Sequence, residues 1–315
     1  MDKVQLSVVI PAFNEQEVIE ASYQRMKKVM DGLKRPYELI FVNDGSKDNT
    51  RAILNNICEG DKNVRVIHFS RNFGHQAAIT AGMEFSQGDA VVVIDADLQD
   101  PPELIEQFVQ KWEEGYDVVY GKRMERKGET FFKKFTAKIF YRFLDRMTNV
   151  EIPVDTGDFR LIDRKVCDAM SSIKEKNRYI RGLISWVGFN QCGVEYVREE
   201  RYAGVTKYPL KKMIKFASDA ITSFSYKPLK LATFSGFFIS AISFLYLLWV
   251  IIEKIFLETA ILPGWASILA VSLFFNGFIL IILGVMGEYI GRIYDEIKDR
   301  PLYIVGEKRG YDKEM

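Results

Sequence analysis

Residues 91–103 read VVVIDADLQDPPE. Four apolar residues run directly into Asp95 and Asp97, which are separated by a single alanine. A short, continuous apolar run bounded by turn residues predicts a strand that is buried on both faces. Two neighbouring carboxylates repel each other, so a strand that ends on them is stable only if a cation neutralises the pair.

The segments around this stretch alternate between strand and helix patterns. Strand patterns lie at 4–13, 37–46, 64–70 and 90–97, and helical patterns lie at 15–33, 48–58 and 75–86. Repeated β–α units predict an α/β fold with a mostly parallel sheet covered on both faces. Ligands of such sheets bind beyond the carboxyl ends of the strands. Those ends carry the sequences PAFNE, NDGS, SRNFG and DADLQD, so we expect all four polar clusters on one rim.

The two aspartates of the DAD sequence are candidate metal ligands. Carboxylate oxygens suit Mg²⁺ or Mn²⁺, and Mg²⁺ commonly bridges protein carboxylates to a substrate diphosphate. A lone DxD is a weak motif, because acids at strand ends often only cap the next helix. Asp100, followed by Pro101 and Pro102, has the pattern of such a cap. The other three polar clusters favour a metal site at Asp95 and Asp97.

Two long uncharged segments follow in the C-terminal third. Residues 231–252 and 259–287 contain no charged side chain, and about 20 apolar residues suffice to span a bilayer. They predict two transmembrane helices, at about 231–252 and 264–287, joined by a short linker. Basic residues are frequent at 207–230 and 292–309, whereas the linker carries only Lys254. The positive-inside rule therefore predicts that both termini are cytoplasmic.

Composition excludes several other classes. A net charge of +1 gives no field that would favour nucleic acid as a partner. The three cysteines, Cys58, Cys167 and Cys192, are odd in number and widely spaced, which indicates reduced thiols rather than a disulfide framework. Two histidines are too few for a zinc site built on histidine.

The rim motifs resemble, in order, those of family 2 glycosyltransferases of the GT-A fold: PAFNE, VNDGSKDNT, SRNFGHQAAITAG and DADLQDPPE. The later segments GKR, TGDFRLIDR, RGLISWVGF and RYAGVTKYPLKKM, with the membrane hairpin, resemble polyprenyl-phosphate glycosyltransferases. This group includes bactoprenol glucosyltransferases and dolichyl-phosphate mannose synthase. The resemblance covers residue 5 to about 300. It implies a cytoplasmic GT-A domain at 1–228, two transmembrane helices within 229–291, and a cytoplasmic C-terminal tail at 292–315.

The resemblance also implies roles for individual residues. Asp44 would read the base edge, and Asp158 occupies the position of the general base in an inverting transferase. The donor and its metal would be held by Pro11, Asn14, Glu15, Asp95, Asp97, Gln99, Arg123 and Lys207, with Asp95, Asp97 and Gln99 as metal ligands and Asp97 also catalytic. A phosphate monoester is already anionic near neutral pH, since its second pKa is about 6. Asp158 could therefore position the acceptor without being indispensable as a base.

Two basic, amphipathic segments point to the acceptor. Residues 131–147 and 208–226 combine an apolar stripe with many lysines and arginines, the pattern of helices in a membrane interface. The alternative is an ordinary helix packed on the core. If both segments lie on the bilayer, Lys134, Lys138 and Arg201 would bind the phosphate of a lipid acceptor.

The sequence therefore predicts an inverting hexosyltransferase of the cell membrane. It would transfer a hexose from UDP-glucose or a related UDP-hexose to polyprenyl (undecaprenyl) phosphate on the cytoplasmic face, and by resemblance it would be a homo-oligomer. Three alternatives remain open: a GDP-mannose-dependent enzyme like dolichyl-phosphate mannose synthase, a catalytically inactive membrane scaffold, and a processive polysaccharide synthase. The absence of a QxxRW sequence disfavours the last.

Overall fold

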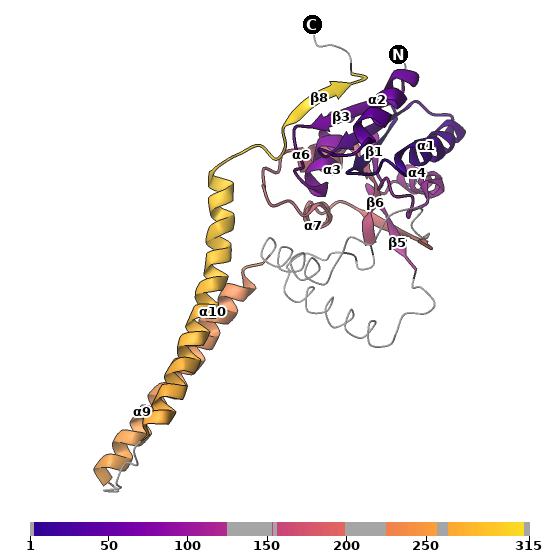
Figure 1. The fold of residues 1–315 in the computed structure, drawn as a ribbon. Helices are drawn as coiled ribbons and strands as arrows, with labels where there is room; N and C mark the ends of the chain where they lie inside the picture. Colours follow the sequence, from indigo (N-terminus) through magenta and orange to yellow (C-terminus); the bar gives the residue numbers. More distant parts are fainter. Residues whose placement is uncertain (1–2, 125–152, 154–155, 199–224, 257–263, 312–315) are drawn as a thin grey trace.

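The computed structural model describes residues 3–124, 153, 156–198, 225–256 and 264–311 (Figure 1). The strands are β1 (Leu6–Ala12), β2 (Tyr37–Asn43), β3 (Val64–Phe69), β4 (Ala90–Val93), β5 (Val118–Arg123), β6 (Thr156–Asp163), β7 (Gln191–Tyr196) and β8 (Val305–Arg309). The helices are α1 (Ile19–Leu33), α2 (Thr50–Gly60), α3 (His75–Phe85), η1 (Pro102–Leu104), α4 (Ile105–Glu113), α6 (Arg164–Ser171), α7 (Ile180–Trp186), α9 (Lys227–Phe256) and α10 (Trp265–Ile297).

The strands form one eight-stranded sheet in the order β7-β5-β6-β4-β1-β2-β3-β8. β1 pairs in parallel with β2 and β4, β2 with β3, and β5 with β7. Only β6 and β8 run against the others among these strands, because β6 is antiparallel to both β4 and β5 and β8 is antiparallel to β3. The predicted α/β class with a mostly parallel sheet is confirmed.

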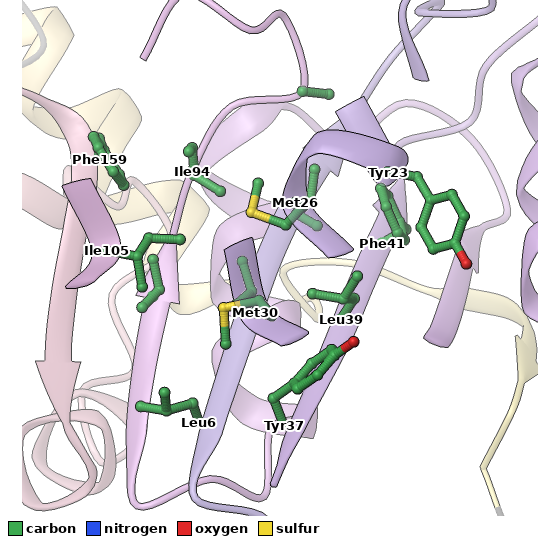
Figure 2. Packing of buried hydrophobic residues seen from close by; sticks show 14 of the residues in the cluster. Leu6, Tyr23, Met26, Met30, Tyr37, Leu39, Phe41, Ile94, Ile105 and Phe159 are labelled. Carbon is green, nitrogen blue, oxygen red and sulfur yellow. The ribbon is translucent and has the colours of Figure 1, made fainter. Parts of the chain in front are cut away.

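Apolar side chains cover both faces of the sheet. β1, β2 and β4 are buried along their whole length, as their continuous apolar sequences predict. On one face they pack against Met26 and Met30 of α1 and Phe108 of α4, and Figure 2 shows α1 side chains among those of the strands. On the other face, α3 packs so closely that a Cβ at Gly82 would lie 2.1 Å from a methyl carbon of Val9.

The reversed direction of β6 positions the site. Because β6 is antiparallel to β4, the first residues of β6 lie at the same rim as the carboxyl end of β4. Val93 pairs with Arg160, so Asp158, two residues earlier in β6, lies level with Asp95 beyond the end of β4. Two segments that are far apart in sequence thus bring their carboxylates together.

α9 and α10 lie side by side and project away from the sheet (Figure 1). Both are long and apolar enough to cross a membrane, and their apolar side chains are exposed, including Phe234, Phe237 and Phe274. They overlap the predicted spans at 231–252 and 264–287, and α10 continues past the predicted end as far as Ile297. The predicted interfacial helices at 131–147 and 208–226 lie outside the described residues, apart from residues 225 and 226.

The segment after α10 returns to the domain, which the sequence did not predict. β8 pairs with β3 along the edge of the sheet. Tyr303 stacks on Phe69 with 4.9 Å between the ring centroids, and Arg309 pairs with Glu59 at 3.0 Å. The predicted tail at 292–315 is therefore built partly into the α10 helix and partly into the sheet.

Candidate active site

The four polar clusters lie on one rim of the sheet, as predicted. After β1, the Asn14 amide N–H donates to Ser46 Oγ at 3.0 Å, and Asn14 Oδ1 accepts from the Lys47 amide at 2.8 Å. Asn14 has a φ of 55°, a left-handed conformation that asparagine tolerates better than most residues. The Glu15 amide donates to Thr50 Oγ1 at 2.9 Å. These bonds fix the loop after β1 against the loop after β2.

Asp44, the predicted base-reading residue, binds the loop after β3. Its carboxylate accepts hydrogen bonds from the Phe73 amide at 2.7 Å and the Gly74 amide at 3.0 Å. Asn72 Nδ2 donates to it at 2.8 Å. Burial raises the pKa of Asp44, against the opposing effect of these amides. In this arrangement Asp44 shapes the turn that starts α3, and its role toward a base remains a prediction.

Four charged side chains from different elements meet beyond β4, and we name them the Asp158 cluster: Asp95, Asp158, His75 and Arg181. Asp158 accepts from Arg181 through two hydrogen bonds, at 2.7 Å from Nε and 3.1 Å from Nη2. His75 Nε2 lies 3.2 Å from Asp158 Oδ2 and 3.5 Å from Asp95 Oδ1. His75 is the first residue of α3 and Arg181 lies in the first turn of α7, so two helices direct their side chains to the start of β6.

The charges of this cluster shift one another's pKa values. Burial would raise the pKa of Asp158, but Arg181 and His75 hold it well below its usual value. Burial would lower the pKa of His75, but Asp95 and Asp158 raise it to about 9. Burial raises the pKa of Asp95 to about 6, although His75 opposes the shift. Asp158 is therefore a firmly ionised carboxylate and a weak base, whereas Asp95 is poorly compensated by protein groups alone.

Asp95 and Asp97 are suited to hold a divalent cation. In the described residues, Asp95 Oδ1 is a buried oxygen without a hydrogen-bond partner, and its ion-pair partner His75 lies 3.5 Å away, so a cation or water could still satisfy it. Asp97 is 8% exposed and accepts from the Gln99 amide through Oδ1 at 3.1 Å. The described part of the chain contains no group of three or more His, Cys, Asp or Glu residues arranged around a common metal position. Two carboxylates at one strand end suit Mg²⁺ or Mn²⁺, and the predicted role of Gln99 as a further ligand stays a prediction.

Asp100 does not cap the following helix, so that prediction is wrong. Pro101 is the N-cap residue of η1 and no side chain caps it. Asp100 turns inward instead and is 1% exposed. It accepts a hydrogen bond from the Tyr196 hydroxyl, and its Oδ2 lies 3.6 Å from Arg123 Nη2. The buried carboxylate is stabilised more by this guanidinium group than it would be by the amides at the start of η1.

The structure brings together some of the predicted residues. The rim of the sheet carries most of them: Asn14, Glu15, Asp44, Asp95, Asp97, Gln99, Arg123 and Asp158. Pro11 lies at the end of β1, next to this rim. Lys134, Lys138, Arg201 and Lys207 lie outside the described residues, so their predicted contacts with phosphates stay predictions.

Sequence reasoning missed His75 and Arg181. His75 directly follows NFG, which looks like an ordinary helix start, and Arg181 opens RGLISW, whose letters give no spacing to the DAD aspartates. The one available signal in the sequence was a glycine directly before a histidine at the start of a helix. In the structure Gly74 has a φ of 102°, and His75 faces Asp95 and Asp158.

Comparisons with known proteins identify the family of this chain. The Glycosyl transferase family 2 profile matches residues 7–170. "Uncharacterized glycosyltransferase YkcC" of Bacillus subtilis is 60% identical over 98% of this chain and 95% of its own length. "SfII prophage-derived bactoprenol glucosyl transferase" of Shigella flexneri is 41% identical over 96% and 97%. Among solved structures, glucosyl-3-phosphoglycerate synthase from Mycobacterium tuberculosis with Mn²⁺, UDP and phosphoglyceric acid aligns with a TM-score of 0.49, at 21% identity, over 70% of this chain and 76% of that chain. The profile match and the near-complete alignment of relatives establish that the chain belongs to glycosyl transferase family 2, as a glycosyltransferase of the GT-A fold.

Proposed function

We propose that the protein transfers a hexose from a nucleotide sugar to a polyprenyl phosphate, with inversion at the sugar and on the cytoplasmic face of the cell membrane. The donor is UDP-glucose or a related UDP-hexose. The observation that carries the proposal is the Asp158 cluster beside the DAD carboxylates, on a domain that bears two exposed apolar helices. Relatives at about 40% identity are named bactoprenol glucosyl transferases, which supports the same acceptor class.

The carboxylates of the DAD sequence serve the donor. A divalent cation held by Asp95 and Asp97 would neutralise the charge that develops on the leaving nucleoside diphosphate. His75, between Asp95 and Asp158, keeps these two carboxylates from repelling each other. The DAD loop can therefore keep its carboxylates close to Asp158 of β6 and present them to the donor.

The acceptor chemistry fits a carboxylate with a lowered pKa. A sugar hydroxyl needs a base to remove its proton, and Asp158 is a weak base because Arg181 stabilises its ionised form. A phosphate monoester needs no such base, since its second pKa is about 6. Asp158 then holds Arg181 in place as a cation at the rim. This reasoning favours a lipid phosphate over a sugar hydroxyl as the nucleophile.

The path of the chain supports a cytoplasmic hairpin. β8, which follows α10, pairs with β3 of the same sheet that precedes α9. This pairing supports a topology in which the residues before the first span and after the second lie on the same side of the membrane, with two crossings between them. The basic residues at both flanks favour the cytoplasm as that side. Tags at the two termini should both be protected from protease added to sealed cells, and cleavage of either from outside would contradict the hairpin.

Transfer itself is tested with the full chain in detergent. We expect radiolabelled glucose from UDP-glucose to enter an organic-extractable lipid when polyprenyl phosphate and Mn²⁺ are present. Asp97→Asn should abolish this transfer, whereas Asp89→Asn, at an exposed ion pair with Lys3, should not. Retention of a tenth of the rate in Asp97→Asn would mean that the cation is held elsewhere. Calorimetric titration with UDP and GDP distinguishes the donors, and preference for GDP would favour the mannose alternative.

A further inference from the structure

Asp100 is the centre of a second charged cluster, which we name the Asp100 cluster: Asp100, Tyr196, Arg123 and Arg198. Asp100 is 1% exposed, and within the described residues its Oδ2 has no hydrogen-bond partner. Arg123 Nη2 lies 3.6 Å from Oδ2, and Arg198 Nε lies 3.4 Å from Oδ1. The Tyr196 hydroxyl donates to Oδ1. One buried carboxylate thus faces two guanidinium groups.

Tyr196 connects the carboxylate with one of these arginines. Its hydroxyl donates to Asp100 and accepts from Arg123 Nε at 3.2 Å. The tyrosine is 5% exposed and its ring packs edge-on against Phe159, with 6.1 Å between centroids. The hydroxyl therefore has a fixed position, and it fixes the orientation of the Arg123 guanidinium in turn.

Two glycines leave room for this arrangement. A Cβ at Gly121 would lie 2.8 Å from the Tyr196 ring, and a Cβ at Gly157 would lie 2.5 Å from Arg123 Nη2. Gly157 immediately precedes Asp158, so the Arg123 guanidinium crosses the backbone of β6 directly beside the Asp158 cluster. A side chain at either position would displace the tyrosine or the arginine.

The charges of the Asp100 cluster favour an anion. One carboxylate and two guanidinium groups leave a net charge of about +1. The side chains of Arg123 and Arg198 are 29% and 26% exposed, so a ligand at the rim can reach them. Each guanidinium has five N–H donors, and among the described residues only Asp100 and Tyr196 engage those of these two arginines. Within the described part of the chain, most of these donors are available to an anion such as a phosphate.

The sheet order indicates which phosphate this is. The loops after β1 and β2, where the nucleoside is expected, lie on one side of β4. Arg123 ends β5 and Arg198 follows β7, and both strands lie on the other side of β4, beyond β6. The DAD loop therefore separates the nucleoside side from the Asp100 cluster. A phosphate bound at the Asp100 cluster approaches the DAD loop from the side opposite the nucleotide, as an acceptor must.

We propose that Asp100 and Tyr196 are positioning residues that hold Arg123 and Arg198 as a paired binding site for the phosphate monoester of the acceptor lipid. This inference rests on the proposed function and adds the site at which the acceptor phosphate is bound. Asp100 and Tyr196 act through the arginines and do not touch the phosphate. Arg198 is a binding residue.

The test is Tyr196→Phe, which removes the hydroxyl and keeps the ring. The matched control is Tyr120→Phe, on the neighbouring strand β5, because the structure gives the Tyr120 hydroxyl no hydrogen bond among the described residues. Three quantities are measured on the full chain in detergent: direct binding of a short-chain polyprenyl phosphate, the KM for that acceptor with UDP-glucose, and the Kd for UDP with Mn²⁺. Arg198→Gln alone and combined with Tyr196→Phe completes a double-mutant cycle.

We expect Tyr196→Phe to weaken acceptor binding and raise its KM about tenfold, since a hydrogen bond to a charged group is lost. The Kd for UDP and the kcat at saturating acceptor should change less than about twofold, well under the effect of one such bond. Tyr120→Phe should match the wild type. In Arg198→Gln, adding Tyr196→Phe should cost less than it does in the wild type, because the hydroxyl holds Asp100 Oδ1, the oxygen that pairs with Arg198.

Other outcomes overturn the inference. A raised Kd for UDP with unchanged acceptor binding would assign the arginines to the donor diphosphate. Unchanged binding of both ligands would leave the Asp100 cluster a purely structural feature. Direct binding of polyprenyl phosphate separates this inference from the proposed function: if the wild type binds the lipid at the cluster but transfers no hexose, only the proposed function fails. Strict additivity in the cycle would show that Tyr196 does not act through Arg198.

Discussion

Replacing Asp158 with asparagine should destabilise the domain as well as impair transfer. The carboxylate is 7% exposed and accepts both Arg181 hydrogen bonds, at 2.7 and 3.1 Å. Arg160 lies two residues further along β6 and is 4% exposed. Burial lowers its pKa, and the charge of Asp158 is the main effect that opposes this shift. Asparagine keeps the shape but leaves these guanidinium groups and His75 without their shared counter-ion.

The magnitude follows from the burial of the pair. Removing one partner of a buried ion pair costs about 3–5 kcal/mol, and water reaches Arg181, so we expect the lower end, about 3 kcal/mol. In a domain of this size that loss should lower the apparent Tm by about 6–12 °C. Arg181→Met in the Asp158→Asn background removes one stranded cation and should recover part of the loss. The assay is thermal unfolding of the full chain in detergent, followed by near-ultraviolet circular dichroism.

Asp89→Asn is the control, because the Asp89–Lys3 pair is exposed and its loss should shift the Tm by at most about 4 °C. UDP binding below the Tm checks that Asp158→Asn remains folded. An unchanged Tm in Asp158→Asn would refute the assignment of Asp158 as the counter-ion of the cluster. Failure of Arg181→Met to recover any stability in that background would refute the coupling between Asp158 and Arg181.

Three further predictions concern stability and the acceptor site. Burial lowers the pKa of His68 to about 4, so between pH 4 and about 6.5 the unfolded state binds more protons than the folded state. The free energy of unfolding should therefore fall by up to about 3 kcal/mol as the pH falls through this range. His68→Asn should flatten this slope in denaturant titrations. Gly157→Ala should displace Arg123 and raise the acceptor KM about tenfold, with little change in Tm because only the end of a flexible side chain must move. Deleting residues 304–315 should expose the edge of β3 and produce aggregates on size-exclusion chromatography, whereas a monodisperse deletion would show that β8 is dispensable.

Much of the fold could be predicted because the relevant signals are local. Continuous apolar runs predict buried parallel strands, and the polar residues that follow each run predict a common rim, since parallel strands end at the same edge. Asp95 and Asp97 were predicted as metal ligands from two carboxylates at one strand end. The length of an apolar run likewise predicts membrane helices without reference to any other segment.

The tertiary structure decided which charges meet. His75, Asp95, Asp158 and Arg181 come from four elements, and their contacts depend on β6 running antiparallel to β4 with Val93 opposite Arg160. No local pattern specifies that register, because the pairing is set by the packing of residues far apart in the chain. The same holds for Asp100: Asp-Pro-Pro favours a helix cap locally, but the sheet brings Tyr196, Arg123 and Arg198 to it, and a buried charge is stable only beside such partners. The strand β8 was equally hidden, because its partner β3 lies more than two hundred residues earlier and only the return of the chain from the membrane hairpin brings the two together.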